Sequence, residues 1–218
     1  MHFNPSNNIQ VKQGEHLVSL KSLTPAIQIF PYYYHQRFPH ALPDCYVREG
    51  VAEKLLQASK LLPPDHQLVV LDGFRPYPLQ VFLYEKFRED FLKSGRDLKE
   101  LEKYVATPSL QKEKPSPHLT GGAVDVTIRN TNGWLEMGTD FDEFSDQAQA
   151  DWYEQLTNPT QQEINIRNNR RLLKEIMEEC GFVPYQGEWW HFDYGNVYWA
   201  KATGQAILYD AISPESLV

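Results

Sequence analysis

Three side chains in two short motifs have the types and the spacing to bind one metal ion. Residues 116–125 read SPHLTGGAVD and contain His118 and Asp125, while residues 188–191 read EWWH and contain His191. Two neutral imidazoles and one carboxylate suit zinc, and three protein ligands leave the fourth tetrahedral position open for water. Because an open position is typical of catalytic zinc sites, the sequence predicts a catalytic rather than a structural metal.

The spacing between His118 and Asp125 requires the chain to reverse. Seven residues of straight strand would separate them by roughly 23 Å, at about 3.3 Å per residue, which one ion cannot bridge. Gly121 and Gly122 lie between them, and glycine adopts backbone angles that other residues avoid. We therefore expect a turn there, followed by a buried strand over residues 123–128 that carries Asp125.

Glu188 is a further candidate because it precedes His191 by three residues. In a regular strand this spacing points the two side chains to opposite faces. A turn or bulge over residues 187–190 would instead bring both to one site, with Glu188 beside the metal. A carboxylate in that position can take a proton from water and pass it to a leaving amine. Taken singly, each of these residues is more often structural, so the interpretation rests on their combination.

The combined pattern is Ser-x-His-x-x-Gly-x-Ala-x-Asp followed by Glu-x-Trp-His. It resembles the zinc D-Ala-D-Ala metallopeptidases, which share a fold with lysostaphin-type peptidases and the hedgehog signalling domain. Within that group, the span from about Tyr32 to Phe192 is similar to the D-alanyl-D-alanine dipeptidases, which hydrolyse free D-Ala-D-Ala. The matching stretches are residues 72–76 (DGFRP), 116–118, 122–125, 137–142 (MGTDFD), 169–172 (NRRL) and 188–191.

The resemblance implies zinc-dependent hydrolysis of the small dipeptide D-Ala-D-Ala to two D-alanines, with one zinc ion per chain. In that family the residue at Ser116 helps to hold the substrate carboxylate, and the residue at Asp142 binds the substrate ammonium. Tyr32 falls where the family often has a tyrosine near the ammonium site. These roles agree with the chemistry, because the ends of a zwitterionic dipeptide call for charged hydrogen bonds.

Arg75 is the candidate for stabilising the transition state. An oxyanion needs a positive partner beyond the metal, and Arg75 follows a predicted buried strand in the DGFRP stretch. The resemblance assigns the same role to this position. The alternative is an ordinary ion pair of Arg75 with Asp72 or Glu85.

Three other interpretations share parts of the pattern. A zinc D,D-carboxypeptidase acting on peptidoglycan stem peptides would carry both metal motifs, but an ammonium-binding carboxylate at Asp142 suits a free dipeptide and obstructs a longer chain. A non-catalytic, zinc-containing binding module of the hedgehog type would need neither Glu188 nor Arg75. The third is a scaffold that has lost its metal.

Length and composition predict a single domain over residues 1–218, with residues 1–30 as an N-terminal arm packed on it. A net charge of −8 argues against nucleic acid and anionic membranes as partners. No apolar run approaches the ~20 residues of a membrane helix. The start shows no signal peptide, which predicts a cytoplasmic protein and leaves a periplasmic location open if a signal has been removed. The oligomeric state stays open.

Apolar periodicity and turn residues predict an α+β fold with a small, mostly antiparallel sheet and flanking helices. Helices are expected over residues 51–62, 79–91 and 98–105, and strands over 67–72, 123–128, 182–185 and 191–194, with a possible edge strand over 198–209. Residues 32–38 are expected to form a strand or a substrate-facing loop, and residues 129–146 a loop.

The last long helix has clear ends in the sequence. Thr160 and Glu163 form a capping-box pattern, and the helix should run to Cys180 and stop at Gly181. We expect its charged residues to form a solvated surface: Arg167, Arg170, Arg171 and Lys174. Cys180 and Cys45 make no spacing motif, so two thiols are expected, with one disulfide as the alternative.

Overall fold

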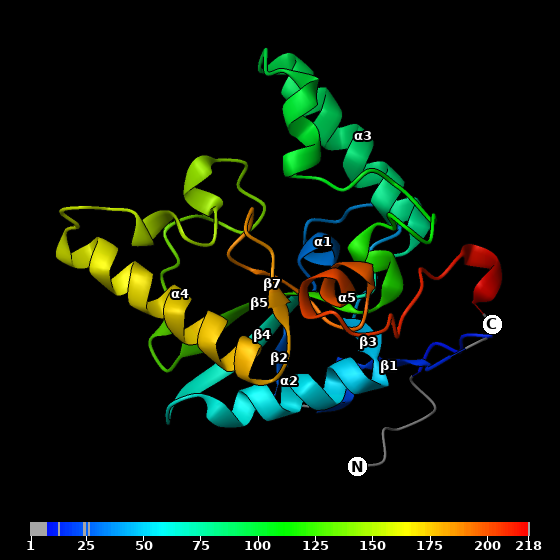
Figure 1. Ribbon diagram of the computed structural model, residues 1–218, viewed down its shortest axis with the longest axis horizontal. Coiled ribbons are helices and arrows are strands. Elements are labelled where there is room, and N and C mark those ends of the chain that lie inside the picture. The colour runs from blue at the N-terminus through cyan, green and yellow to red at the C-terminus, as the bar shows by residue number, and fades with distance from the viewer. Residues whose placement is uncertain (1–7, 13, 24, 26, 218) are drawn as a thin grey trace.

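The centre of the fold is a six-stranded sheet (Figure 1). The computed structural model describes residues 8–12, 14–23, 25 and 27–217. The strands of the whole fold are β1 (Leu17–Ser19), β2 (Gln28–Ile29), β3 (Tyr46–Arg48), β4 (His66–Asp72), β5 (Ala123–Asn130), β6 (Gly133–Trp134), β7 (Val183–Pro184) and β8 (His191–Asp193). Strands β1 and β3 form a separate two-stranded sheet. The central sheet has the order β2-β4-β5-β8-β7, with β6 paired to β5. Since β2 and β4 are parallel and the other pairs of this sheet antiparallel, the predicted mostly antiparallel α+β fold is confirmed.

Helices flank this sheet and connect its strands. The α-helices are α1 (Tyr32–His35), α2 (Glu49–Leu61), α3 (Tyr77–Lys93), α4 (Gln161–Glu179) and α5 (Val197–Thr203). The described residues also contain short 3₁₀ helices: η2 (Leu20–Leu23), η3 (Leu98–Lys103), η4 (Pro117–Thr120), η5 (Asp146–Ala148), η6 (Trp152–Glu154) and η7 (Pro214–Ser216). The described residues include no helix that is both long and apolar enough to cross a bilayer.

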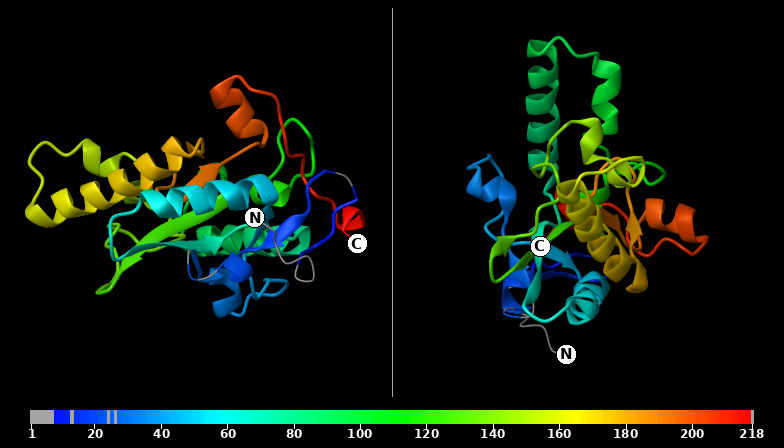
Figure 2. Two further views of the ribbon diagram at one scale, coloured as in Figure 1. Left: turned by 90° about the horizontal axis from the view of Figure 1, so that it is seen from below. Right: turned by 90° about the vertical axis from the view of Figure 1, so that its left-hand side faces the viewer.

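The central strand β5 separates a hydrophobic core from a polar face. Val124, Val126 and Ile128 are fully buried in the main core, together with apolar side chains of α2 and α4, which lie on one side of the sheet (Figure 2, left). Burying one such side chain contributes about 1.5–3 kcal/mol. Because side chains alternate along a strand, Asp125 and Thr127, both buried, point to the opposite face.

Helix α4 has the predicted ends. Thr160 Oγ1 accepts a hydrogen bond from the backbone N–H of Glu163, and the Glu163 carboxylate accepts one from the backbone N–H of Thr160, which completes the capping box. Gly181 follows the helix with a φ of +89°, in the left-handed region that favours glycine. The expectation of a solvated charged face was wrong for Arg170, which is only 5% exposed because residues 137–149 fold back across α4 and accept its hydrogen bonds.

Three segments differ from the expectation. Residues 32–35 form the short helix α1, and residues 129–146 contain β6, which makes a hairpin with β5. The expected edge strand over residues 198–209 was wrong, because this stretch begins with α5. The Asn196 side chain accepts hydrogen bonds from the backbone N–H groups of Tyr198 and Trp199 and so caps that helix.

Helix α3 projects from the body of the molecule with η3 beside it (Figure 1; Figure 2, right). The chain then returns over residues 104–117 to η4, which precedes β5. This returning segment forms much of one wall of the cavity described below. Cys45 and Cys180 are both buried free thiols, as expected.

Candidate active site

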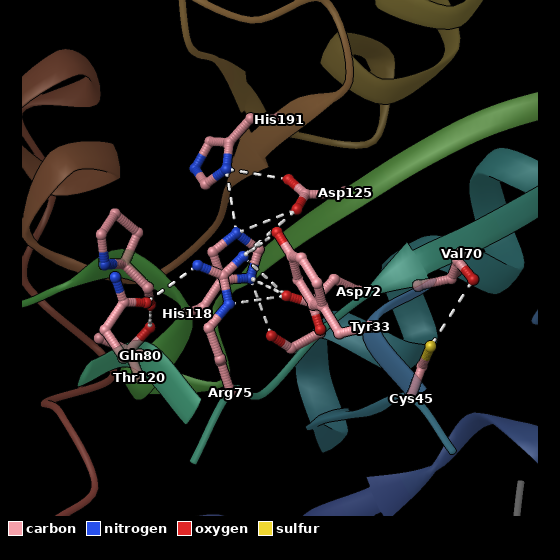
Figure 3. Close-up of polar contacts among 12 residues, drawn as sticks. Tyr33, Cys45, Val70, Asp72, Arg75, Gln80, His118, Thr120, Asp125 and His191 are labelled. Carbon is pink, nitrogen blue, oxygen red and sulfur yellow. Dashed lines mark hydrogen bonds and ion pairs between the residues drawn. The ribbon is translucent and has the colours of Figure 1, made fainter. Parts of the chain in front are cut away.

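His118, Asp125 and His191 converge on one point, although they come from η4, β5 and β8 (Figure 3). His118 Nε2 lies 3.2 Å from His191 Nδ1, and the Asp125 carboxylate oxygens lie 3.4 Å from the first nitrogen and 3.1 Å from the second. All three ligand atoms lie within 4.8 Å of one another. The three residues selected from the sequence therefore form one cluster.

Local structure explains this convergence. The left-handed φ of +70° at Gly121 reverses the chain after η4, as expected for the glycine pair. The Thr120 hydroxyl donates to Pro117 O and accepts from the backbone N–H of Gly122, which fixes the turn. Asp125 then pairs with His191 in the β5–β8 register, so the sheet itself places two of the three side chains together.

A second layer of hydrogen bonds orients both imidazole rings. His118 Nδ1 lies 2.8 Å from the carbonyl oxygen of Gly73, which only accepts, so this nitrogen carries the proton and Nε2 offers its lone pair. His191 Nε2 lies 3.4 Å from Asp193, which leaves Nδ1 as the ligating atom. Asp193 in turn accepts a hydrogen bond from Asn196, the cap of α5. Partners of this kind orient metal-ligating histidines in general.

The donor set fits a divalent cation. Two imidazole nitrogens with facing lone pairs repel one another unless a proton or a cation lies between them. Burial alone would raise the pKa of Asp125, but the charge interactions and hydrogen bonds with His118 and His191 hold that pKa well below its usual range. With a cation bound in place of the imidazole protons, two nitrogens and one ionised carboxylate would make the nitrogen- and oxygen-rich set that zinc prefers.

Glu188 lies beside this cluster without belonging to it. The chain turns between β7 and β8, and the Glu188 carboxylate comes within 4.0 Å of His191 Nδ1. Of the two geometries considered for the EWWH stretch, the structure therefore has the turn. Burial raises the pKa of Glu188 to about 8, although the charge of His191 opposes the shift. A carboxyl group with a pKa near neutral is well suited to exchange protons.

Arg75 supplies a buried positive charge next to the cluster (Figure 3). Its Nε donates to Asp72 over 2.9 Å, its Nη1 donates to Gln80 over 2.9 Å, and its Nη2 lies 3.8 Å from Asp125. Burial disfavours the charged form, but Tyr33, Asp72 and Asp125 raise the pKa of Arg75 above its usual value. Of the two ion pairs considered as the alternative role of Arg75, the structure has the one with Asp72, which holds the guanidinium in place. Glu85 pairs with Arg88 instead.

Asp142 lies at the same cavity on the segment that follows β6. Its backbone has a φ of +62°, a left-handed conformation that is unusual for aspartate and needs support from its surroundings. Tyr33 donates a hydrogen bond of 2.8 Å to its carboxylate. Burial raises the pKa of Asp142 to about 7, against the opposing charge of Arg75.

Tyr33, rather than the expected Tyr32, lines the cavity. The Tyr33 hydroxyl joins Asp142 to Arg75, whose Nη2 lies 3.3 Å away, and its ring lies under the guanidinium. The Tyr32 ring instead packs edge-on against Phe141, at 4.7 Å between centroids. The sequence has three consecutive tyrosines at residues 32–34. In one turn of helix their side chains point in different directions, so the sequence pattern alone could not identify the one that faces the cavity.

Ser116 does not line the cavity. It is 1% exposed, and its hydroxyl donates to Thr107 O and accepts from the backbone N–H of Ser109. Both contacts tie the returning segment to η4, so this hydroxyl supports the wall of the cavity. Thr107 and Ser109 themselves belong to that wall.

The cavity around these residues has a volume of about 610 Å³, within the usual range for small-molecule sites. His118, Asp125 and His191 face it together with Glu188, Arg75 and Asp142. Aromatic side chains form other parts of the wall: Phe87, Tyr104, Tyr185, Trp190 and Tyr198. A metal-ligand cluster, a proton-exchanging carboxyl group and a buried cation facing one cavity are the parts needed for hydrolysis of a peptide bond.

Comparison with known proteins agrees with this chemistry. A family model described as D-ala-D-ala dipeptidase matches residues 38–207. A D-alanyl-D-alanine dipeptidase of Synechocystis is 32% identical over 194 residues, covering 77% of this chain and 74% of the relative. One of Escherichia coli is 33% identical over 128 residues, covering 58% and 54%.

Two solved structures show a distant overall similarity. The vancomycin-resistance D,D-dipeptidase VanXYg, bound to a D-Ala-D-Ala phosphinate analogue, has a TM-score of 0.42 at 20% identity and covers 94% of this chain and 66% of its own. A variant of the D,D-pentapeptidase VanY, in complex with Zn(II), has a TM-score of 0.44 at 15% identity, covering 76% and 83%. The family match over residues 38–207 identifies this chain as a peptidase that belongs to the D-Ala-D-Ala dipeptidase family.

Proposed function

We propose that this peptidase hydrolyses free D-Ala-D-Ala in one domain over residues 1–218, with a single zinc ion held by His118, Asp125 and His191. The observation that carries the proposal is the convergence of these three ligand atoms within 4.8 Å in a cavity that also holds Glu188. A zinc ion bound there would polarise a carbonyl group and lower the pKa of water.

Glu188 moves the proton. Its carboxylate accepts a proton from the attacking water as the water oxygen bonds to the carbonyl carbon, and it donates that proton to the leaving nitrogen as the C–N bond breaks. Its side chain is only 14% exposed, so bulk water does not compete for these transfers. The turn before β8 positions it without any contribution to metal binding.

Arg75 stabilises the negative charge that develops on the carbonyl oxygen. Asp72 and Gln80 hold its guanidinium in a fixed orientation, so no reorganisation is needed when the charge appears. Tyr33 bridges Arg75 to Asp142 and so links the charge-stabilising group to the substrate-binding one.

Asp142 receives the free ammonium of the dipeptide. Its carboxylate lies in the cavity beside Tyr33, and a substrate ammonium would offset the burial that raises its pKa. An ammonium-binding carboxylate favours a free dipeptide over the D,D-carboxypeptidase alternative, because a longer stem peptide has no positive charge at that point.

Blocking the substrate amine should therefore slow the reaction. N-acetyl-D-Ala-D-Ala should be cleaved at least tenfold more slowly than D-Ala-D-Ala, because an unsatisfied buried group costs about 1–3 kcal/mol and about 1.4 kcal/mol is a factor of ten. Asp142→Ala should lower kcat/KM on the free dipeptide and narrow the gap between the two substrates. D-Alanine release measures both rates.

Asp140→Ala is the matched control, because Asp140 is an exposed acid on the same segment. It should keep the preference for the free amine. Equal rates on the acetylated and free substrates in the unmodified enzyme would favour the carboxypeptidase and leave Asp142 without a role in recognition.

A further inference from the structure

Arg170 is a buried cation on α4 that the mechanism above does not use. It is 5% exposed, and its guanidinium donates to three backbone carbonyls: to Met137 O over 2.7 Å, to Gln149 O over 2.7 Å and to Gln147 O over 2.9 Å. The rings of Tyr153 and Trp189 lie 4.7 Å and 5.7 Å from it.

These three carbonyls belong to the two ends of one segment. Residues 137–149 leave the region of β6, carry Asp142 to the cavity and return to η5, and Arg170 joins the start of the segment to its end. A planar guanidinium can reach carbonyls in several directions at once, which the ammonium of lysine cannot do with the same geometry.

Trp189 adds a second attachment for the same segment. Its backbone N–H donates to Ala148 O, and its indole Nε1–H donates to Thr139 Oγ1, both over 2.9 Å. Trp189 also follows Glu188 directly in the chain. The segment is thus anchored to both α4 and the turn that carries the proposed proton-transfer group.

The middle of the segment needs such anchors. Asp142 has a left-handed φ of +62°, a conformation that costs free energy for a residue other than glycine and persists only where the surroundings impose it. A misplacement of about 1 Å in a substrate-positioning group can cost 10²-fold in rate. If the ends of the segment are loosened, the Asp142 carboxylate should therefore move away from its position in the cavity.

We propose that Arg170 is a positioning residue that fixes Asp142 in the cavity and thereby sets the selectivity for dipeptides with a free amino terminus. The proposal rests on the ammonium-binding role of Asp142 proposed above. Arg170 acts through the backbone of residues 137–149 and does not touch the substrate.

Arg170→Met tests this role, with the zinc-loaded enzyme and D-Ala-D-Ala beside N-acetyl-D-Ala-D-Ala as substrates. We expect KM for the free dipeptide to rise at least tenfold and the preference over the acetylated substrate to fall by a similar factor, with zinc content unchanged and a smaller change in kcat. Arg170→Lys should recover only part of the preference. Amide exchange should become faster within residues 138–146.

Arg171→Met is the matched control. Arg171 neighbours Arg170 on the same helix, but it is exposed and pairs with Glu154 over 2.5–2.6 Å. It should keep KM, selectivity and exchange at the levels of the unmodified enzyme.

Thr139→Val provides a second, milder variant that does not depend on the folding of Arg170→Met. It removes the acceptor for the Trp189 indole and should shift KM and selectivity in the same direction by a smaller factor. If both variants keep the selectivity while Asp142→Ala narrows the gap between the two substrates, the positioning role of Arg170 is overturned and the ammonium site at Asp142 stands. Unchanged selectivity in Asp142→Ala itself overturns the proposed ammonium site and the positioning role with it.

Discussion

Replacement of Glu188 with glutamine should keep the metal site and remove most of the turnover of D-Ala-D-Ala. The amide has nearly the same shape as the carboxylate but cannot accept the proton of the attacking water. General acid–base catalysis contributes about 10²–10⁴-fold, and we expect kcat to fall by a factor in or above that range. Steady-state kinetics together with the zinc content of the purified variant give the result.

A loss of protein stability should not explain the lower turnover of Glu188→Gln. In the metal-free protein, burial raises the pKa of Glu188 to about 8 and so disfavours its charged form. The neutral amide should therefore leave the unfolding temperature of the metal-free protein at or above its original value. Glu154→Gln makes the same chemical change at a partly exposed acid outside the cavity lining and should leave kcat unchanged. Near-normal turnover of the zinc-loaded Glu188→Gln variant would remove Glu188 from the mechanism.

Replacement of Arg75 with methionine should lower kcat by about 10²–10³-fold, the range observed when one oxyanion-stabilising donor is lost. Arg75→Lys keeps a charge but loses the fork that Asp72 and Gln80 hold, so it should recover only part of the activity. Rates measured at saturating dipeptide give kcat and so separate a loss of transition-state stabilisation from weaker substrate binding.

Arg75 could instead serve only as the structural partner of Asp72. Measuring both the unfolding temperature and kcat of the variant distinguishes this structural role from stabilisation of the transition state. Arg75→Met leaves the Asp72 carboxylate, 13% exposed, without its 2.8 Å partner, so some loss of thermal stability is expected in either case. The matched variant Arg88→Met breaks an exposed pair with Glu85 on the following helix and should change neither property. A lower unfolding temperature with unchanged kcat would mean that Arg75 is purely structural.

Local signals in the sequence predicted the turn before Asp125 and four strands of the central sheet, β4, β5, β7 and β8. The combined motif then selected the three residues of the metal-ligand cluster. The turn at Gly121 follows from the φ freedom of glycine, and the buried strand β5 follows from its β-branched residues. Asp125 and His191 are neighbours because β5 and β8 pair in a fixed register. The capping box at Thr160 is likewise a property of a few consecutive residues.

Features that depend on distant contacts could not be predicted in this way. Arg170 has the sequence signature of a solvated helix face, and its burial depends on residues 137–149 crossing α4. Ser116 matches a family position, yet its hydroxyl binds the backbone of Thr107 and Ser109. For α5, by contrast, a local signal existed: Asn196 before the helix and Gly204 after it are ordinary capping residues.

Family membership narrows the functional alternatives. A match to the D-Ala-D-Ala dipeptidase family over residues 38–207 makes this chain a peptidase, which disfavours a purely structural zinc module. The cavity holds both Glu188 and Arg75, which such a module would not need. The remaining choice between a dipeptidase and a carboxypeptidase depends on what Asp142 binds.

Zinc titration of the metal-stripped enzyme, with D-alanine release measured from D-Ala-D-Ala and from a tripeptide ending in the same pair, tests the central claim most directly. We expect activity on the free dipeptide to rise with added zinc and saturate at one ion per chain, with the tripeptide cleaved at least tenfold more slowly. His118→Ala should abolish the zinc-dependent rise. Full dipeptide hydrolysis without any metal, or equal turnover of the tripeptide, would contradict the account.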